Sequence, residues 1–328
     1  MDSGSLRLKS GCIGSPRYRG RRSFPDSRAP LPFSSGLLAS ITLSLCNPAA
    51  GQAQTHRLAY TVFSDAGPEI RVVYDDGSDN RRLGPGGEAT WSPDGERLAI
   101  TLEVDGNVDI YVMSALDGSG LTRLTTHPAD DHGASWSPDG SMIAFNSDRS
   151  GSDQIWRRNV EEGNWGAYLV QLTQDTYHGR VNNFLSWSPD GRWIAFEADR
   201  DRDDPEIYLA NAVDGTNQQR LTFTRALDEV PSWSPDGTRI LFSSDMHDEP
   251  LSRNYDIYIM NVDGSEQVRL TNTPGAASYP TMSPDGQKIA YSYSDADGES
   301  SRIMIMNADG SGQEVLIGNG SIPRFAPR

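Results

Sequence analysis

Small groups of acidic, amide, hydroxyl and histidine side chains recur along this chain of 328 residues, and their chemistry is that of a binding site. Carboxylates attract a cation or a basic segment of another protein, while amides, hydroxyls and imidazoles add hydrogen bonds. The candidate partner-binding residues are Asp131, His132, His178, Asn182, Asn183, Asp228, Glu229, Ser278 and Tyr279. Any single member can equally be a solvated turn residue, because these residue types are common in turns. The group is therefore a better candidate than any one residue.

Catalytic motifs are absent from the sequence. It contains no G-x-S-x-G, no H-E-x-x-H and no phosphate-binding glycine loop. His127, His132 and His178 could bind a divalent metal together with carboxylates, but their spacing matches no strict ligand pattern. The alternation Asp105-x-Asn107-x-Asp109 resembles part of a calcium loop, yet Ile110 stands where the turn glycine belongs, which favours turn capping. We predict no catalytic residue, no metal and no cofactor.

A repeated motif determines which elements position these groups. W-S-P-D-G begins at Trp91, Trp136, Trp187 and Trp233, and M-S-P-D-G begins at Met282. Within Ser-Pro-Asp-Gly, proline presets φ at the first corner of a turn and glycine takes the left-handed position that starts the next strand. The motif therefore predicts a tight hairpin in each repeat.

Three further strands follow each hairpin turn. An apolar triplet such as Ile143-Ala144-Phe145 comes first, then a β-rich segment such as Asp256-Ile257-Tyr258-Ile259-Met260, and then a strand of the form Arg269-Leu270-Thr271. Four short strands in about 46 residues are typical of a propeller blade. Glycine and proline, at 32 and 20 residues, fit such strands and turns better than helices.

Five complete repeats and two incomplete ends predict six blades. Leu58-Ala59-Tyr60 begins a blade that has no S-P-D-G strand before it, and Ile322 to Pro327 supplies such a strand at the other end. We expect an all-β, six-bladed propeller over residues 54–328, with blades that start near 57, 91, 136, 187, 233 and 282. Residues 321–328 are expected to complete the first blade and to close the ring.

Loop lengths indicate which face carries function. The S-P-D-G turn has a constant length, whereas the loops after the apolar triplet and before each repeated tryptophan vary. These two variable classes emerge on one face of a four-stranded meander, and variable loops on a rigid scaffold commonly bind ligands. The candidate residues lie in the loops that enter the inner strands, so we expect them around the channel mouth on that face.

These residues resemble the TolB-type, WD-like S-P-D-G repeat family of six-bladed β-propellers, from Leu58 to Pro327. The resemblance implies a periplasmic propeller that binds a protein or peptide, in a Tol-type envelope system, without the α/β domain that precedes the propeller in TolB. Related blades occur in serine peptidases and oligogalacturonate lyases. Two alternatives to a non-catalytic binding scaffold thus stay open: a metal-dependent polysaccharide lyase or hydrolase, and a carbohydrate-binding module.

Residues 1–53 have the order of an export signal. Basic residues precede an apolar run from Gly36 to Cys46, and small residues end at Ala53. The apolar run is too short to span a bilayer. We expect cleavage near Ala53, a periplasmic or secreted protein, and a mature chain without cysteine, since Cys12 and Cys46 both precede that site.

The charge of the chain limits its partners. The whole sequence has a formal charge of −16, and residues 54–328 contain 22 basic and 43 acidic residues, or −21. Such a surface repels phosphate backbones and anionic lipids. We therefore predict no nucleic-acid binding and no stable membrane insertion, and we expect a monomer that binds a protein or peptide at an acidic channel mouth.

Overall fold

The computed structural model describes residues 55–160, 168–174, 181–200, 204–247, 253–296, 298 and 300–328. The side chains of residues 181–183 also lie outside the description. Chain contacts divide the protein into Met1–Gln52 and Ala53–Arg328, and the described residues all belong to the second unit. The expected export segment, residues 1–53, thus lies outside the described residues. The described part contains no helix that is long and apolar enough to cross a bilayer.

The second unit is built from six four-stranded antiparallel sheets, here called blades 1 to 6. Blade 1 contains β24 (Ser321–Phe325), β1 (Arg57–Val62), β2 (Glu69–Tyr74) and β3 (Arg81–Pro85). Blade 2 contains β4 (Gly87–Trp91), β5 (Arg97–Val104), β6 (Asn107–Ser114) and β7 (Thr122–Arg123). Blade 3 contains β8 (Asp131–Trp136), β9 (Met142–Ser147), β10 (Gln154–Asn159) and β11 (Val170–Gln171).

The other three blades repeat this order. Blade 4 contains β12 (Val181–Trp187), β13 (Trp193–Ala198), β14 (Glu206–Asn211) and β15 (Gln219–Arg220). Blade 5 contains β16 (Asp228–Trp233), β17 (Arg239–Ser244), β18 (Asp256–Asn261) and β19 (Val268–Arg269). Blade 6 contains β20 (Ala276–Met282), β21 (Lys288–Ser294), β22 (Ser301–Asn307) and β23 (Glu314–Ile317).

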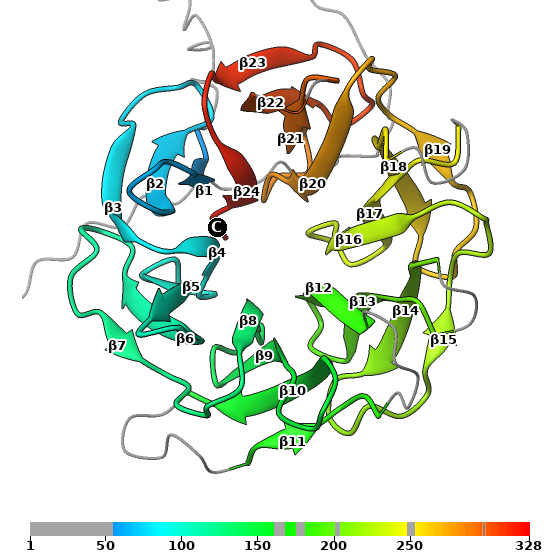
Figure 1. The fold of residues 1–328 in the computed structure, drawn as a ribbon. Coiled ribbons are helices and arrows are strands. Elements are labelled where there is room, and N and C mark those ends of the chain that lie inside the picture. Colours follow the sequence, from blue (N-terminus) through cyan, green and yellow to red (C-terminus); the bar gives the residue numbers. More distant parts are fainter. Residues whose placement is uncertain are drawn as a thin grey trace, which may run out of the picture. The chain divides into compact units, whose positions relative to one another are not determined.

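The blades form a closed ring with the first-named strand of each at the centre (Figure 1). Closure is achieved by β24, which pairs antiparallel with β1 through Leu58 opposite Phe325 and Ala59 opposite Arg324. The last strand of the chain therefore joins the first described strand. This arrangement confirms the predicted six-bladed, all-β propeller and its closure.

The S-P-D-G turns are stabilised by their own side chains. In blade 3, Ser137 Oγ donates to Asp139 Oδ1 (2.6 Å) and accepts from the N–H of Met142 (2.9 Å), while Asp139 also accepts from the N–H of Ser141. These hydrogen bonds lower the pKa of Asp139, with the Ser137 hydroxyl as the largest cause. Gly140 has φ of 71°, the left-handed conformation expected of the turn glycine.

The Arg-x-Thr strands are explained by a buried polar cluster. In blade 5, Asp256 is 3% exposed, and Arg269 Nε donates to its Oδ2 (3.0 Å) while Thr271 Oγ1 donates to its Oδ1 (2.7 Å). Thr271 Oγ1 also accepts from the N–H of Ile257. Asp109 is bound in the same way by Arg123 and Thr125. Asp109, the last residue of the Asp105-x-Asn107-x-Asp109 segment, thus belongs to such a structural cluster.

The hydrophobic core lies between neighbouring blades. One cluster joins Ala99 and Ile110 of blade 2 to Trp136 and Phe145 of blade 3, and the other clusters join successive blades around the ring. Two of the repeated tryptophans also cross these boundaries, because Trp91 Nε1 donates to the carbonyl of Arg324 (3.0 Å) and Trp233 Nε1 donates to that of Ser186 (3.0 Å). A blade cannot bury its two faces alone, so the ring provides the core.

Each inner strand contains a β-bulge three residues before its last residue. The six bulge residues have φ between 46° and 61°, and we call them the left-handed belt: Glu88, Gly133, Phe184, Val230, Tyr279 and Ile322. Val230 and Ile322 are β-branched residues for which this conformation is a genuine outlier. Side chains of the preceding blade bind some of their N–H groups, since Thr61 Oγ1 accepts from Glu88 and Ser292 Oγ accepts from Ile322. A β-bulge redirects the side chains of its strand, so the belt affects which side chains of the inner strands face the channel.

Candidate binding sites at the two channel mouths

The inner strands begin at one end of the channel, which we call the acidic mouth, and it is here that the described candidate residues lie. Three candidates directly precede the belt residue of their own strand and are partly exposed: His132 on β8, Glu229 on β16 and Ser278 on β20. Tyr279 is a belt residue. Asn182 and Asn183 belong to β12, but their side chains lie outside the described residues, as does all of His178.

Asp131 and Asp228 hold equivalent places in blades 3 and 5, and both are 0% exposed. Arg149 Nη2 donates to both carboxylate oxygens of Asp131, at 2.6 and 2.8 Å. The guanidinium also lies over the rings of Phe145 and Trp156, 5.3 and 5.2 Å from their centroids. Asp131 is therefore an internal support of the mouth, out of direct reach of a partner.

Asp228 has hydroxyl neighbours and forms no ion pair with a cation among the described residues. Thr224 Oγ1 donates to its Oδ2 (3.3 Å), and Oδ1 is buried without a hydrogen-bond partner in the described part of the chain. Burial raises the pKa of Asp228 to about 7, with a smaller contribution from the negative charge of Glu206. A buried carboxylate in this state exchanges a proton near neutral pH.

Further carboxylates at this mouth were missed by the sequence analysis. Glu197, on β13, is 7% exposed, and its Oε2 accepts from the N–H of Val230 (2.8 Å). Burial, followed by the charge of Glu229, raises the pKa of Glu197 well above its usual range. Burial likewise raises the pKa of Glu229, although a hydrogen bond from Tyr255 opposes the shift. Glu197 and Glu229 therefore form an acidic pair between blades 4 and 5 in which burial favours the protonated form.

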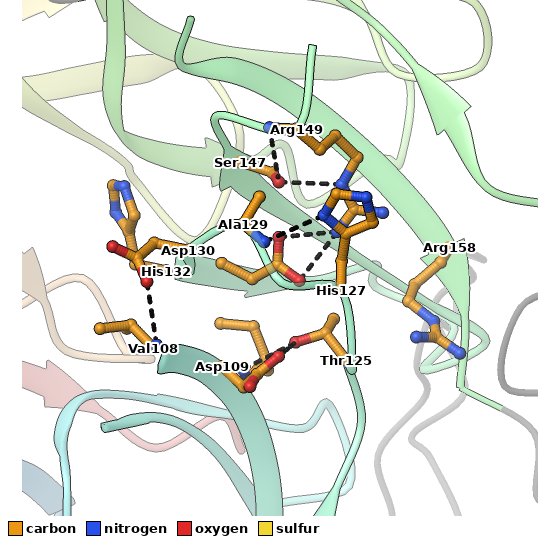
Figure 2. A network of polar contacts seen from close by, with 12 residues as sticks. Val108, Asp109, Thr125, His127, Ala129, Asp130, His132, Ser147, Arg149 and Arg158 are labelled. Carbon is orange, nitrogen blue, oxygen red and sulfur yellow. Dashed lines mark hydrogen bonds and ion pairs between the residues drawn. The ribbon is translucent and has the colours of Figure 1, made fainter. Parts of the chain in front are cut away.

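His132 and Glu88 extend the acidic mouth toward blades 2 and 3. Nε2 of His132 lies 3.8 Å from an oxygen of Asp153. Burial opposes protonation of His132, but Asp153, Glu88 and Asp130 together raise the pKa of His132. Figure 2 shows this side of the mouth, where Asp130 also accepts from the N–H of Val108 (3.0 Å). Glu88 accepts from Thr101 Oγ1 (2.9 Å) and from the N–H of Gly133 (3.1 Å).

The belt narrows the channel between its two ends. Phe184 of blade 4 and Tyr279 of blade 6 contact each other edge to face, with ring centroids 5.0 Å apart. A small cavity beside them is bordered by Glu88, Ile322 and Arg324. Burial raises the pKa of Tyr279, and the nearby Glu88 and Glu197 act in the same direction. The tyrosine is thus a neutral hydrogen-bonding group at the neck of the channel.

The opposite end of the channel, which we call the S-P-D-G mouth, opens into a cavity of about 1020 Å³. Its wall repeats around the ring and consists of Trp91, Trp136, Trp187, Trp233, Met282 and Phe325, with Pro93, Pro138, Pro189, Pro235, Pro284 and Pro327 outside them. The sequence analysis placed function at the variable loops and did not predict this cavity. The repeated tryptophan and proline carry a signal for this cavity, although the proline by itself predicts only a turn.

No group of three or more histidine, cysteine, aspartate or glutamate side chains with metal-binding geometry occurs among the described residues. His132 and His127 lie in the described part of blades 2 and 3, whereas His178 does not. His127 Nδ1 accepts from the N–H of Ala129 (3.1 Å), as in a local turn. The described arrangement can bind cations and hydrogen-bond donors through carboxylates, and it offers no assembled nucleophile and base.

Comparisons with known proteins agree with this architecture. The family model of the TolB beta propeller domain matches residues 39–178 and 176–327. TolB from Acinetobacter baumannii is similar in structure, with a TM-score of 0.69 and 24% identity over 83% of this chain and 67% of that chain. A putative TolB from Agrobacterium tumefaciens gives a TM-score of 0.62 and 25% identity over 82% of this chain and 91% of that one.

A chain of the nidogen/laminin complex shares the fold at 14% identity, with a TM-score of 0.60 over 83% of this chain and 98% of that chain. No curated protein sequence matches significantly. The family model, by contrast, covers most of the sequence, including all six blades. The chain therefore belongs to the TolB β-propeller domain family.

Proposed function

We propose that this protein is an exported, monomeric TolB-like propeller that acts as a non-catalytic binding scaffold for a protein partner in a Tol-type envelope system. The partner would place a basic segment in the acidic mouth. The observation that carries the proposal is the Glu197–Glu229 pair, two largely buried carboxylates whose pKa values are raised by burial, with their mutual repulsion also raising that of Glu197. A lysine or arginine from a partner would relieve both effects.

The surroundings of the pair support a protein partner. Glu88 and Asp130 add negative charge on the far side of the mouth, and His132 and Tyr279 offer hydrogen bonds. The six blades hold these groups on strands, so little conformational entropy is lost when a partner binds. The whole of residues 54–328 has a charge of −21, which would steer a basic partner toward the protein at low salt.

Export to the periplasm is proposed from residues 1–53. Their basic, apolar and small-residue order matches a secretory signal, and the two TolB structures provide a family context for a periplasmic protein. The test is the size of the protein recovered from a periplasmic fraction. Cleavage near Ala53 would give an N-terminus at about that residue by mass spectrometry, and recovery of the full-length chain from the cytoplasm would contradict this part of the proposal.

The binding test is a quantitative pull-down from periplasmic extract with wild type and with a Glu88→Gln, Glu229→Gln variant. The matched control carries Glu266→Gln and Glu314→Gln, which make the same charge change at exposed sites away from the channel. We expect the channel variant to capture at least tenfold less partner than wild type and the control to capture as much as wild type. Capture by wild type should weaken as the salt concentration rises. Equal capture by wild type and channel variant would contradict the proposal.

A further inference from the structure

A second ring of polar groups lies at the S-P-D-G mouth, one residue before the repeated aromatic position of each blade. We call it the hydroxyl ring. Its members all border the cavity of about 1020 Å³, and they are Thr90, Ser135, Ser186, Ser232, Thr281 and, in the sixth blade, Arg324. Five blades thus contribute a hydroxyl at this level and one contributes a guanidinium. None contributes a carboxylate.

The hydroxyls have donor capacity to spare. Ser135 Oγ accepts from the N–H of Trp187 (3.1 Å), and Thr281 Oγ1 accepts from the N–H of Phe325 (3.4 Å). A hydroxyl that accepts from the backbone keeps its own proton for another acceptor. Thr90 Oγ1 is buried and has no hydrogen-bond partner within the described residues. The ring therefore contains hydroxyl groups that can each donate a hydrogen bond to a ligand.

Arg324 is a cation that forms no ion pair with a described residue, although the charge of Glu88 acts on it from the belt side. Its Nη1 donates to the carbonyl of Pro323 (3.0 Å), and no ion pair of Arg324 occurs among the described residues. Glu88 lies on the belt side, where Thr101 and Gly133 already donate to its carboxylate. Burial lowers the pKa of Arg324, while Tyr279 and the negative charge of Glu88 oppose that shift. Arg324 remains charged, and a partly buried guanidinium favours a ligand of opposite sign.

The wall above this ring is apolar. Four successive blades contribute a tryptophan to the cavity, one contributes a methionine and one a phenylalanine, and prolines border its rim. The aspartates of the rim, Asp236 and Asp285, accept hydrogen bonds from the serines of their own turns. A pocket with apolar walls and a few convergent polar groups is the usual form of a small-ligand site. Arg239 and Arg328 also border the cavity, and Arg324 is the arginine at the level of the hydroxyl ring, where one guanidinium neutralises one negative charge.

We propose that the S-P-D-G mouth binds a monoanionic organic carboxylate, with its head on Arg324 and the hydroxyl ring and its apolar body against the tryptophans. The belt with its Phe184–Tyr279 contact lies between this site and the acidic mouth, and Arg324 also borders the small cavity that Glu88 lines at the belt. The proposal does not depend on the proposed protein partner. It assigns different ligands to the two ends of one channel, a basic segment at one and a carboxylate at the other.

The test uses 3-phenylpropionate as the probe, with 3-phenylpropanamide as a neutral molecule of the same shape. Binding to the purified protein is measured by calorimetry and by the fluorescence of the cavity tryptophans. We expect saturable binding of the acid and at least tenfold weaker binding of the amide. Equal affinity for acid and amide, or no saturable binding of the acid, would overturn the proposal. Tighter binding of phenyl phosphate would overturn the assignment to a carboxylate.

Variants locate the head group. Arg324→Met is expected to lower the affinity for the acid at least tenfold and to leave that for the amide unchanged. Arg192→Met is the control, since Arg192 is 78% exposed on the same face and does not border the cavity. Should Arg324→Met fail to fold, Ser186→Ala with Ser232→Ala tests the ring, with a threefold or greater loss expected. An unchanged affinity in a folded ring variant would contradict the site.

Discussion

Asp131 and Asp228 hold the same position in blades 3 and 5, and their electrostatic environments are opposite. Each begins an inner strand five residues before the repeated tryptophan, and each is 0% exposed. Arg149 forms a two-oxygen ion pair with Asp131. At the place that corresponds to Arg149, four residues after Phe242, blade 5 has Met246. Asp228 is left with hydroxyl donors and with the repulsive charge of Glu206.

The difference shows that the repeat fixes where a carboxylate lies and that a neighbouring loop fixes its charge state. The paired Asp131 contributes a stable internal ion pair to the wall of the mouth. Asp228, with a pKa of about 7, is neutral or charged according to the pH. Burial of an unpaired carboxylate disfavours its ionised form, whereas a guanidinium beside it favours that form.

The largest effect is expected from Arg149→Met, which gives blade 3 the environment of blade 5. The variant leaves Asp131 buried without its cation, and it also removes a guanidinium that packs on Phe145 and Trp156. Removing one partner of a buried ion pair costs about 3 to 5 kcal/mol. Urea denaturation at pH 8 should show this loss of unfolding free energy, and the loss should be smaller at pH 5. A loss of unfolding free energy below about 1 kcal/mol would contradict the contrast between the paired Asp131 and the unpaired Asp228.

Asp228→Asn should stabilise the protein at pH 8. At pH 8 the wild-type carboxylate is ionised, and the burial of this charge lowers the stability of the folded state. The neutral amide can accept from Thr224 and donate toward Glu206, so we expect a gain of about 1 to 3 kcal/mol. Urea denaturation at pH 8 measures it. A destabilised variant would show that Asp228 is paired in solution.

The same group predicts the pH dependence of stability. An aspartate in the unfolded chain loses its proton near pH 4, whereas Asp228 in the folded protein keeps it until about pH 7. Between these values the folded state binds more protons, so the Asp228 contribution to stability is present at low pH and is lost as the pH rises toward 7. Thermal unfolding from pH 4 to pH 8 should show a decline that Asp228→Asn reduces. Identical profiles would contradict the assignment.

Met246→Arg is the reciprocal exchange and should have a moderate effect. The new guanidinium can lie over Phe242, as Arg149 lies over Phe145, and reach Asp228. We expect the pKa of Asp228 to fall and the unfolding free energy at pH 8 to rise by about 1 kcal/mol. The titration of Asp228, followed by NMR with Asp228→Asn for assignment, measures the shift. An unchanged titration would show that the loop of blade 5 cannot position the cation.

The smallest effect is expected at an exposed pair. Arg192 Nε lies 2.7 Å from Asp190 Oδ2, and the two side chains are 78% and 44% exposed. Exposed ion pairs contribute about 0 to 1 kcal/mol, so Arg192→Met should change the unfolding free energy by less than about 0.5 kcal/mol. Urea denaturation under the conditions used for Arg149→Met provides the direct contrast. A loss as large as that of Arg149→Met would mean that removal of any arginine, buried or exposed, is costly.

The sequence predicted the scaffold well because each blade carries its own local instructions. Ser137 and Asp139 form their turn with residues at most five positions away, and Thr271 and Arg269 close on Asp256 in the same blade. The level of the mouth residues could also be read from their distance to the tryptophan. Closure by β24 followed from counting strands at the two ends of the chain.

Glu197 and Arg324 could not be identified in this way. Glu197 reaches the mouth from the second strand of blade 4 and accepts from Val230 in blade 5, so no sequence spacing connects them. Arg324 stands alone among hydroxyls of five other blades, and its isolation appears only when the ring is closed. Their roles depend on contacts between residues that are far apart along the chain.

By itself, the sequence determined an all-β ring of six blades, its closing strand and the acidic character of residues 54–328. These follow from short-range periodicity, turn chemistry and composition, which a single chain displays directly. The tertiary structure decided that Asp131 is paired and Asp228 has no ion pair among the described residues, that Glu197 joins Glu229, and that a tryptophan-lined cavity bordered by Arg324 lies opposite the acidic mouth. Electrostatic energy depends on distance and burial, and both are set by packing between blades.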